Sequence, residues 1–443
     1  MAGRIFSFVR FMFRPRNFIL FGSFILLLAA PGGLAAAAPD PAGASPGLAL
    51  AKPDRWSAPK SPQRILVVPL AFSRKKADGT VVSIADQNLQ SLDEIRQRYA
   101  IDLVDYFRQI SPGKIEIEVT VTGWVMLPKS VDEYRMNFRI YHPDRLKTWL
   151  NQVALVRDGA NAIDGAYDVS AYDALMMVPG CSSLEFGGSG YVFRHAKGFP
   201  VLWTRSGKRL PPVDVHAQTT PFPSLPHSLA HIMGGYRDGR VVVPDLFSFE
   251  ARSTPGPYSY ANQYVGGDRA MQYISPHAGP WDIMSQHGIK IHPWTSLFQG
   301  IAVQGMTSFT RLRLGLVQQS QICTVERGDT KEVLLNPLTR HDVKTSVIYL
   351  PLDNARYYLI ENRQVEGIDK HLPTDGVLIL KVDESVPDGH GPVRLIDAHP
   401  QAHFFSQAPF KVGEQYQNGE EKISVKVIGK EGADYRLEIR RGM

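Results

Sequence analysis

The sequence predicts an α/β domain followed by a β-rich, sandwich-like C-terminal domain. Strand-like and helix-like segments alternate in the first part of the chain, and short segments of alternating polar and apolar residues replace them from Lys331 onward. The chain has 443 residues, 44% of them hydrophobic and 21% charged, which is enough to bury a core. We expect the α/β domain at 62–320 and the β-rich domain at 321–443.

The α/β prediction depends on five segments. Continuous apolar runs indicate buried strands, helical spacing indicates helices, and alternation indicates a half-buried strand. In chain order they are a buried strand at 65–70, a helix at 92–110 that ends at Ser111-Pro112-Gly113, a half-buried strand at 115–121, a helix at 146–156 and a buried strand at 174–178.

The β-rich prediction depends on four short segments at 346–350, 357–360, 377–380 and 423–427. Each has the β-branched and aromatic residues, or the alternation, that is typical of strands in a sandwich.

Residues 1–38 have the pattern of a secretory signal. Four arginines precede an apolar run of thirteen residues at 18–30, and small residues follow it up to Ala38. This run is shorter than the roughly 17 to 25 residues that cross a bilayer, so we expect a secreted or periplasmic protein, attached to a membrane only if the signal is uncleaved. Residues 39–61, rich in Ala, Pro, Gly and Ser, predict a flexible linker.

The charge argues against a nucleic-acid-binding protein, whereas the two cysteines leave two alternatives. Loss of the leader lowers the formal net charge from +6 to +2, and no lysine-rich stripe is present, so we expect no nucleic-acid partner. Cys181 and Cys323 form one disulfide in an exported protein or remain two separate thiols, and the sequence leaves both open.

One pair of histidines has metal-binding spacing. His227 and His231 lie four positions apart, directly after Pro226, so a helix would place both imidazoles on one face. His399 and His403 share this spacing in a region where no helix is expected, and we interpret that pair as accidental. For the first pair, zinc binding and a metal-free, hydrogen-bonded pair remain the two alternatives.

Further motifs accompany the first pair in a fixed order. They are Val243-Pro244-Asp245-Leu246-Phe247, Gly279-Pro280-Trp281-Asp282-Ile283-Met284 and the run from Phe309 to Val317. With His227 and His231 they resemble the immune inhibitor A family of secreted bacterial zinc metallopeptidases, which has H-E-x-x-H-x-x-G-L-P-D-L-Y, G-x-W-x-x-M and K-L-x-L-G-W-V. Upstream and downstream segments extend the resemblance to about residues 62–400.

The resemblance implies a metzincin-like zinc-peptidase domain. It implies that His227, His231 and Asp245 are the zinc ligands and that Met284 forms a hydrophobic floor beneath the metal. Ser228 stands where the family has its general-base glutamate, and a neutral, short hydroxyl cannot replace a carboxylate. No residue is therefore assigned as catalytic.

The third ligand is displaced along the chain. Asp245 follows His231 by fourteen residues, against six in the family. The inserted loop either bulges outward and returns Asp245 to the metal or leaves the site open. Asp238 is a rival ligand, and Asp245 as a loop cap is an equal alternative.

Other residues have weaker signals. Five histidines could approach the site, namely His195, His216, His277, His287 and His292. The glycine-rich run 186–190 lacks the spacing of a phosphate loop or nucleophile elbow and predicts a turn. Four carboxylates of the C-terminal domain, Asp369, Asp375, Asp383 and Glu384, could bind calcium, or they are solvated strand ends.

Three functions follow as hypotheses. The first is an exported metallopeptidase homologue, catalytically impaired by Ser228, that binds peptide or protein in the former cleft. The second is an active zinc-dependent endopeptidase with a substitute base, Asp238 or Glu250. The third is a structural scaffold of the cell envelope.

Overall fold

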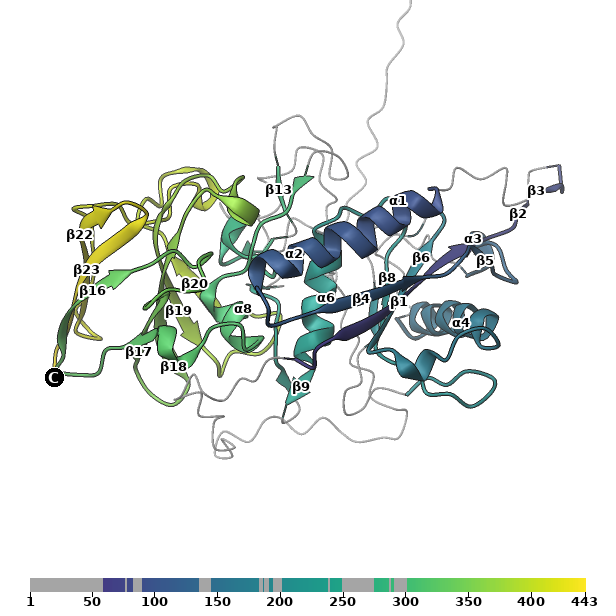
Figure 1. Ribbon diagram of the computed structural model, residues 1–443, viewed down its shortest axis with the longest axis horizontal. Helices are drawn as coiled ribbons and strands as arrows, with labels where there is room; N and C mark the ends of the chain where they lie inside the picture. The colour runs from purple at the N-terminus through teal and green to yellow at the C-terminus, as the bar shows by residue number, and fades with distance from the viewer. Residues whose placement is uncertain are drawn as a thin grey trace, which may run out of the picture.

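The computed structural model describes residues 59–75, 78–82, 90–134, 145–182, 186, 191–193, 201–237, 240–248, 275–286, 288–290 and 301–443. The expected leader and most of the expected linker lie outside these residues. The described chain is mixed α/β, with sheets at both ends and few helices (Figure 1). None of its helices combines the length and hydrophobicity needed to span a membrane.

The N-terminal sheet has the strand order β4-β1-β6-β8-β7, with β5 paired to β1. All pairings are parallel except that of β7, which runs antiparallel beside β8. Its strands are β1 Gln63–Ala71, β4 Ile117–Val121, β5 Val125–Met126, β6 Ala174–Pro179, β7 Tyr191–Phe193 and β8 Val213–Val215.

Successive side chains of strand β1 point to opposite sides of the sheet, and β1 is buried because both sides are covered. Ile65 and Val67 pack in one hydrophobic cluster with the helical segment 92–110 and with α6 (Ser224–Gly234). Leu66 and Val68 pack in a second cluster with α4 (Arg145–Ile163) on the other face. This double burial explains why the sequence shows a continuous apolar run rather than alternation.

The helices of this part differ slightly from the predicted spans. The segment 92–110 is one continuous helical stretch with a π-helical middle, and Ser91 and Glu94 form a capping box at its start. The second helix, expected at 146–156, extends over nineteen residues. The helices are α1 Leu92–Arg96, η3 Gln97–Asp102, α2 Leu103–Ile110, α3 Val131–Tyr134, α4 Arg145–Ile163, α6 Ser224–Gly234 and α8 Ser308–Arg313.

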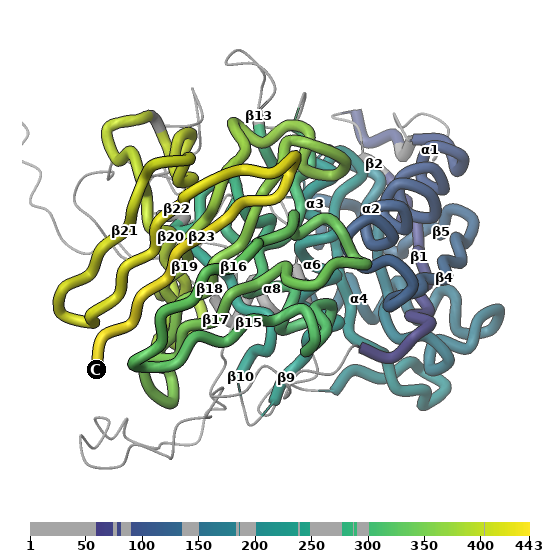
Figure 2. The backbone as a smooth tube through the Cα atoms, turned by 60° about the vertical axis from the view of Figure 1, so that its left-hand side comes forward, coloured from purple at the N-terminus to yellow at the C-terminus, as the bar shows by residue number. Residues whose placement is uncertain are grey.

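The C-terminal part consists of two sheets that lie face to face (Figure 2). One has the order β15-β17-β18-β19-β20 and the other β16-β23-β22-β21. Their strands are β15 Ile322–Thr324, β16 Thr330–Leu335, β17 Val347–Pro351, β18 Arg356–Arg363, β19 Gly376–Asp383, β20 Val393–Ile396, β21 Gln415–Asn418, β22 Ile423–Glu431 and β23 Asp434–Arg441.

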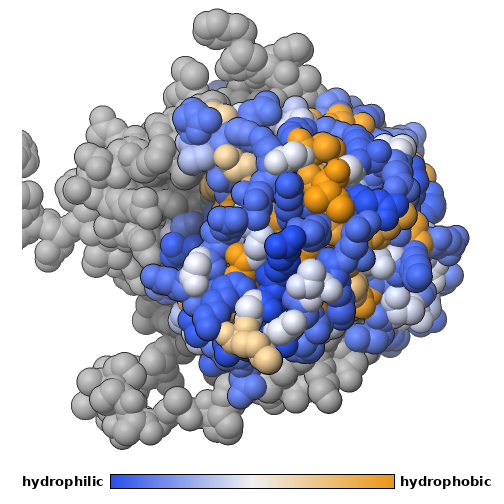
Figure 3. Space-filling view, turned by 90° about the vertical axis from the view of Figure 1, so that its left-hand side faces the viewer, coloured by the Kyte–Doolittle hydropathy of each residue, from blue (hydrophilic) through white to orange (hydrophobic). Residues whose placement is uncertain are grey.

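Alternate side chains of the first C-terminal sheet face different cores. Ile348 and Ile360 meet Val425 and Leu437 of the second sheet. Leu359 and its neighbours on the opposite face join the cluster that contains the N-terminal helices, so the two parts share a core. The side of the C-terminal part that faces away from the N-terminal sheet is mostly hydrophilic (Figure 3).

A buried ionic network also joins the two parts. Arg363 of β18 lies 3.2 Å from Glu361 and 2.7 Å from Asp369, and all three side chains are fully buried. Its guanidinium also donates to the carbonyl of Trp281 at 2.7 Å. Because a buried charge is tolerated only when it is paired, these groups hold the Trp281 turn against β18.

Neither a group of calcium ligands in the C-terminal domain nor a disulfide between Cys181 and Cys323 is found among the described residues. The four carboxylates named for calcium form no group of three potential ligand residues in the described part of the chain, where the one group of that kind lies elsewhere. The four carboxylates are dispersed, because Asp369 pairs with Arg363, Glu384 with Arg313, Asp375 with two lysines, and Asp383 bonds within its own turn. Cys181 and Cys323 are thiols rather than the halves of a disulfide.

Candidate metal-ion site

Helix α6 carries both histidines of the predicted pair. It begins at Ser224, two residues before Pro226, and Ser224 to Ile232 are all buried. It ends where Gly235 takes a φ of 61°, which favours glycine, and the N–H of Gly235 bonds the carbonyl of His231 at 3.0 Å. His227 and His231 therefore lie one turn apart on the same face of a buried helix.

A short hairpin accommodates the extra residues after the helix. Strands β9 (Tyr236–Arg237) and β10 (Arg240–Val241) pair antiparallel, and the chain then returns along the helix. Gly234 permits this return, because a Cβ at Gly234 would lie 2.6 Å from Cγ2 of Val243. The returning chain places Asp245 opposite the two histidines, whereas Asp238 lies outside the described residues.

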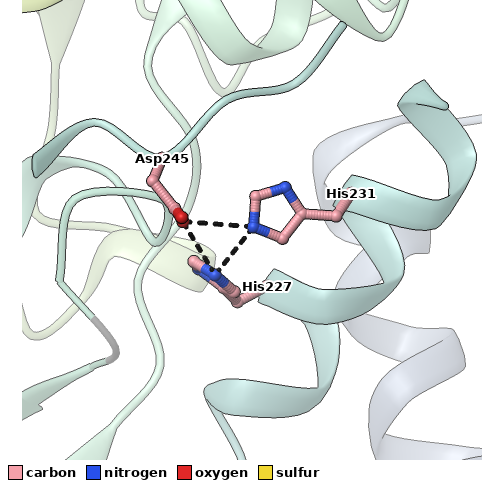
Figure 4. A group of neighbouring side chains, drawn as sticks. All are labelled: His227, His231 and Asp245. Atoms are coloured by element: carbon pink, nitrogen blue, oxygen red, sulfur yellow. Dashed lines mark hydrogen bonds and ion pairs between the residues drawn. The ribbon is translucent and has the colours of Figure 1, made fainter. Parts of the chain in front are cut away.

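Three ligand atoms converge in the site (Figure 4). The two imidazole Nε2 atoms are 3.0 Å apart, and Oδ1 of Asp245 lies 3.2 Å from Nε2 of His227 and 3.1 Å from Nε2 of His231. All three residues are buried, with exposed fractions of 3, 3 and 1%. The structure thus brings together the three residues that the sequence nominates as metal ligands.

The opposite ring nitrogens define the tautomers. Nδ1 of His227 donates to the carbonyl of Ile283 at 3.0 Å, and Nδ1 of His231 donates to that of Val243 at 2.8 Å. A carbonyl accepts only, so each Nδ1 carries a proton, and in a ring that carries no second proton the lone pair on Nε2 faces Asp245. Without a cation three acceptor atoms face one another, and one proton can bridge only one pair of them.

The three atoms have the spacing of metal ligands. A tetrahedral ion with bonds of about 2.05 Å separates its ligands by about 3.3 Å, close to the three distances observed. Histidines that donate their second nitrogen to a carbonyl are oriented as metal-binding histidines usually are. The group can therefore hold a metal ion, and no other group of this kind occurs in the described chain.

The charge of Asp245 suits the same role. Burial raises the pKa of its carboxyl, but the adjacent His231 and His227 together outweigh burial and lower it below the ordinary value. The carboxylate is therefore ionised at neutral pH and presents a negative charge to the two imidazoles.

The carbonyl that orients His227 belongs to a rigid turn. Asp282 is fully buried and accepts hydrogen bonds from the N–H of Met284 at 2.7 Å, from Thr307 at 2.8 and 2.6 Å, and from the Thr310 hydroxyl at 2.7 Å. The pKa of Asp282 is raised by burial, which these donors partly offset. Met284 is completely buried and packs in the main cluster.

Ser228, which stands where the resembled family has its general base, makes a contact that the sequence did not predict. The hydroxyl of Ser228 lies 2.9 Å from Nε2 of His216, which follows strand β8, and the same nitrogen lies 3.0 Å from Oδ1 of Asp214. All three are buried. The only signal in the sequence is that Asp214 and His216 alternate with apolar residues. Geometrically this is no Ser-His-Asp triad, because Asp214 and Ser228 approach the same ring nitrogen.

The other residues that the sequence nominates do not join the group of His227, His231 and Asp245. Nε2 of His277 is within 3.0 Å of the Ser248 hydroxyl. His399 bonds Glu414 at 2.9 Å in the C-terminal domain, which agrees with our interpretation of its pair as accidental. Glu250 and the remaining histidines named as able to approach, His195, His287 and His292, lie outside the described residues.

Comparison with known proteins adds no relative. Neither the scan against protein-family models nor the search of curated proteins found a match. The functional argument therefore depends on the residues and the geometry of this chain.

Proposed function

We propose that this protein is an exported zinc-binding relative of the immune inhibitor A metallopeptidases, which binds a peptide or protein at the ion rather than cleaving it at an ordinary peptidase rate. The observation that carries the proposal is the convergence of the His227 and His231 Nε2 atoms with Oδ1 of Asp245, all within 3.2 Å.

The choice of zinc follows from the donor set. Two imidazoles and one carboxylate suit zinc, whereas calcium and magnesium prefer oxygen ligands throughout. Zinc sites with three protein ligands keep a fourth position for water or a ligand, and structural sites usually have four. The described chain supplies three ligands.

The metzincin-like part of the proposal is supported by the arrangement around α6. A helix with H-S-x-x-H, a later aspartate and a methionine-containing turn occur in the order that the family resemblance implies. The antiparallel strand β7 ends the N-terminal sheet, and among the described strands it pairs only with β8. An extended peptide can add to such an edge through main-chain hydrogen bonds, which supports a peptide ligand.

Impaired hydrolysis follows from Ser228. A positioned general base contributes roughly 10² to 10⁴ in rate, and the Ser228 hydroxyl is neutral and already engaged with His216. We therefore expect binding without efficient turnover.

Burial of the three ligands favours a second candidate, a purely structural ion. With exposed fractions of 1 to 3%, the ligands reach an external peptide only after local opening. In the structural alternative the ion stabilises the fold and exchanges no ligand, which corresponds to the scaffold hypothesis.

The first experiment measures zinc by elemental analysis in the purified full chain. The wild type is compared with His227→Ala/His231→Ala and with the matched control His399→Ala/His403→Ala, which has the same spacing. We expect about one zinc per chain in the wild type and the control and none in the first variant. No zinc in the wild type refutes the proposal.

The second experiment separates the two candidates. Zinc is replaced by cobalt(II), whose visible spectrum reports its ligands, and a peptide hydroxamate is added. A spectral change indicates an exchangeable fourth position and supports peptide binding at the ion. An unchanged spectrum with stoichiometric cobalt refutes peptide binding at the ion and favours the structural role.

A further inference from the structure

The chain segment that carries Asp245 is bonded to the C-terminal domain. The carboxylate of Asp388, in the connection between β19 and β20, accepts a hydrogen bond from the backbone N–H of Asp245 at 2.8 Å. On either side of this contact, Arg240 donates to the carbonyl of Glu384 at 2.9 Å, and Ser248 forms an isolated antiparallel bridge with His390. The connection 384–392 therefore contacts both ends and the middle of the segment 240–248.

The Asp388 contact acts on a proposed metal ligand directly. Asp245 is fixed on its C-terminal side by the bond from the N–H of Leu246 to the carbonyl of Met284 at 2.9 Å. Asp388 fixes the N-terminal side, and a hydrogen bond to a carboxylate is stronger than one between neutral groups. Together the two bonds set the backbone from which Oδ1 of Asp245 reaches both imidazoles.

An ion pair anchors the same connection. Oε1 of Glu384 lies 2.8 Å from Nη2 of Arg313 and accepts the hydroxyl of Tyr357 at 2.6 Å. Arg313 also donates to the carbonyl of Val242 at 3.2 Å. Arg313 thus links the start of the connection to the chain three residues before Asp245.

We propose that Asp388 is a positioning residue for the metal-ion site, so that docking of the connection 384–392 and ion binding are coupled. The inference rests on the proposed zinc binding and adds that the connection 384–392 of the C-terminal domain controls the affinity for zinc. By thermodynamic reciprocity, the factor by which docking strengthens ion binding is the factor by which the ion strengthens docking. Loss of a group that orients a metal ligand typically costs about 10- to 100-fold in affinity.

The test measures zinc affinity of the full chain by competition with a chromophoric chelator. Asp388→Ala removes the acceptor and is expected to weaken binding by at least about 10-fold. Asp388→Asn retains an oxygen acceptor and should recover most of the affinity. Asp383→Ala is the matched control, because it removes the same charge beside the same connection, where its carboxylate bonds Ser385.

Hydrogen exchange gives a readout that does not depend on activity. In the wild type, zinc should slow amide exchange within 384–392, and Asp388→Ala should abolish most of this effect. Equal zinc affinities of the wild type and Asp388→Ala overturn the inference, as does an equal loss in Asp383→Ala. Wild-type protein that binds no zinc refutes the proposed function itself, whereas wild-type binding that is indifferent to Asp388 refutes only the coupling.

If Asp388→Ala fails to fold, the remaining comparisons still test the coupling between docking of the connection and ion binding. Asp388→Asn with wild-type affinity, together with zinc-dependent protection of 384–392 in the wild type, supports the coupling. Absence of that protection in a zinc-loaded wild type overturns it.

Discussion

Replacement of Gly234 by alanine tests whether the returning chain after α6 positions the metal site. The added Cβ would lie 2.6 Å from Cγ2 and 3.1 Å from the backbone N of Val243. Ordinary carbon contacts are about 3.5 Å or longer, so Val243 has to retreat by about 1 Å. The bond from Nδ1 of His231 to the carbonyl of Val243, now 2.8 Å, would then exceed the hydrogen-bond limit of about 3.5 Å.

The expected loss of zinc affinity and the expected change in stability can be estimated separately. Loss of the bond that orients His231 should weaken zinc binding about 10- to 100-fold, or about 1.4 to 2.8 kcal/mol. The clash costs about 1 to 3 kcal/mol of stability, and alanine returns about 1 kcal/mol through its helix propensity, so the apo protein should still fold.

The assay is chelator competition for zinc, with urea unfolding of the apo protein in parallel. Gly159→Ala in α4 is the control, because the three atoms nearest to its Cβ would be side-chain atoms of Leu70 and Met177, at 3.2 Å, in the other core. A Gly234→Ala protein with wild-type zinc affinity would refute the argument that the Val243 carbonyl orients His231.

Three further outcomes are expected. The lowered pKa of Asp245 keeps this carboxylate ionised until the pH falls below its ordinary value near 3.8, so protonation of Asp245 should not contribute to zinc release above that pH, which dialysis at stepped pH followed by elemental analysis checks. Ser228→Glu/His216→Ala restores a carboxylate and clears space for it, and casein cleavage should rise about 10²-fold or more over the single His216→Ala variant; no rise contradicts the assignment of Ser228 to the base position. Arg363→Met leaves two buried carboxylates without their cation and should cost about 3 to 5 kcal/mol in urea unfolding, against less than about 1 kcal/mol for the exposed Arg340→Met.

Local patterns predicted much of the secondary structure, because burial imposes a period on the sequence. The apolar run at 65–70 became β1 since a parallel strand with helices on both faces needs no polar side. The spacing at 92–110 became the continuous helical stretch for the equivalent reason at a period of 3.6. Helix boundaries were less accurate, as the extra residues of α4 show, because tertiary packing extends a helix beyond its periodic part.

The sequence by itself nominated the two histidines, because their pairing depends on residue type and on spacing along one helix, while Asp245 and the serine at the expected base position followed from the family resemblance. Only the tertiary structure decided that Asp245 returns to the two histidines, since a hairpin of unknown path and a glycine contact at Val243 bring it there. Only the tertiary structure, likewise, placed His216 against Ser228 and Asp388 against Asp245, which lie 12 and 143 residues apart in the chain. Such contacts leave no period in the sequence, because they join single atoms of segments that only the packed core brings together.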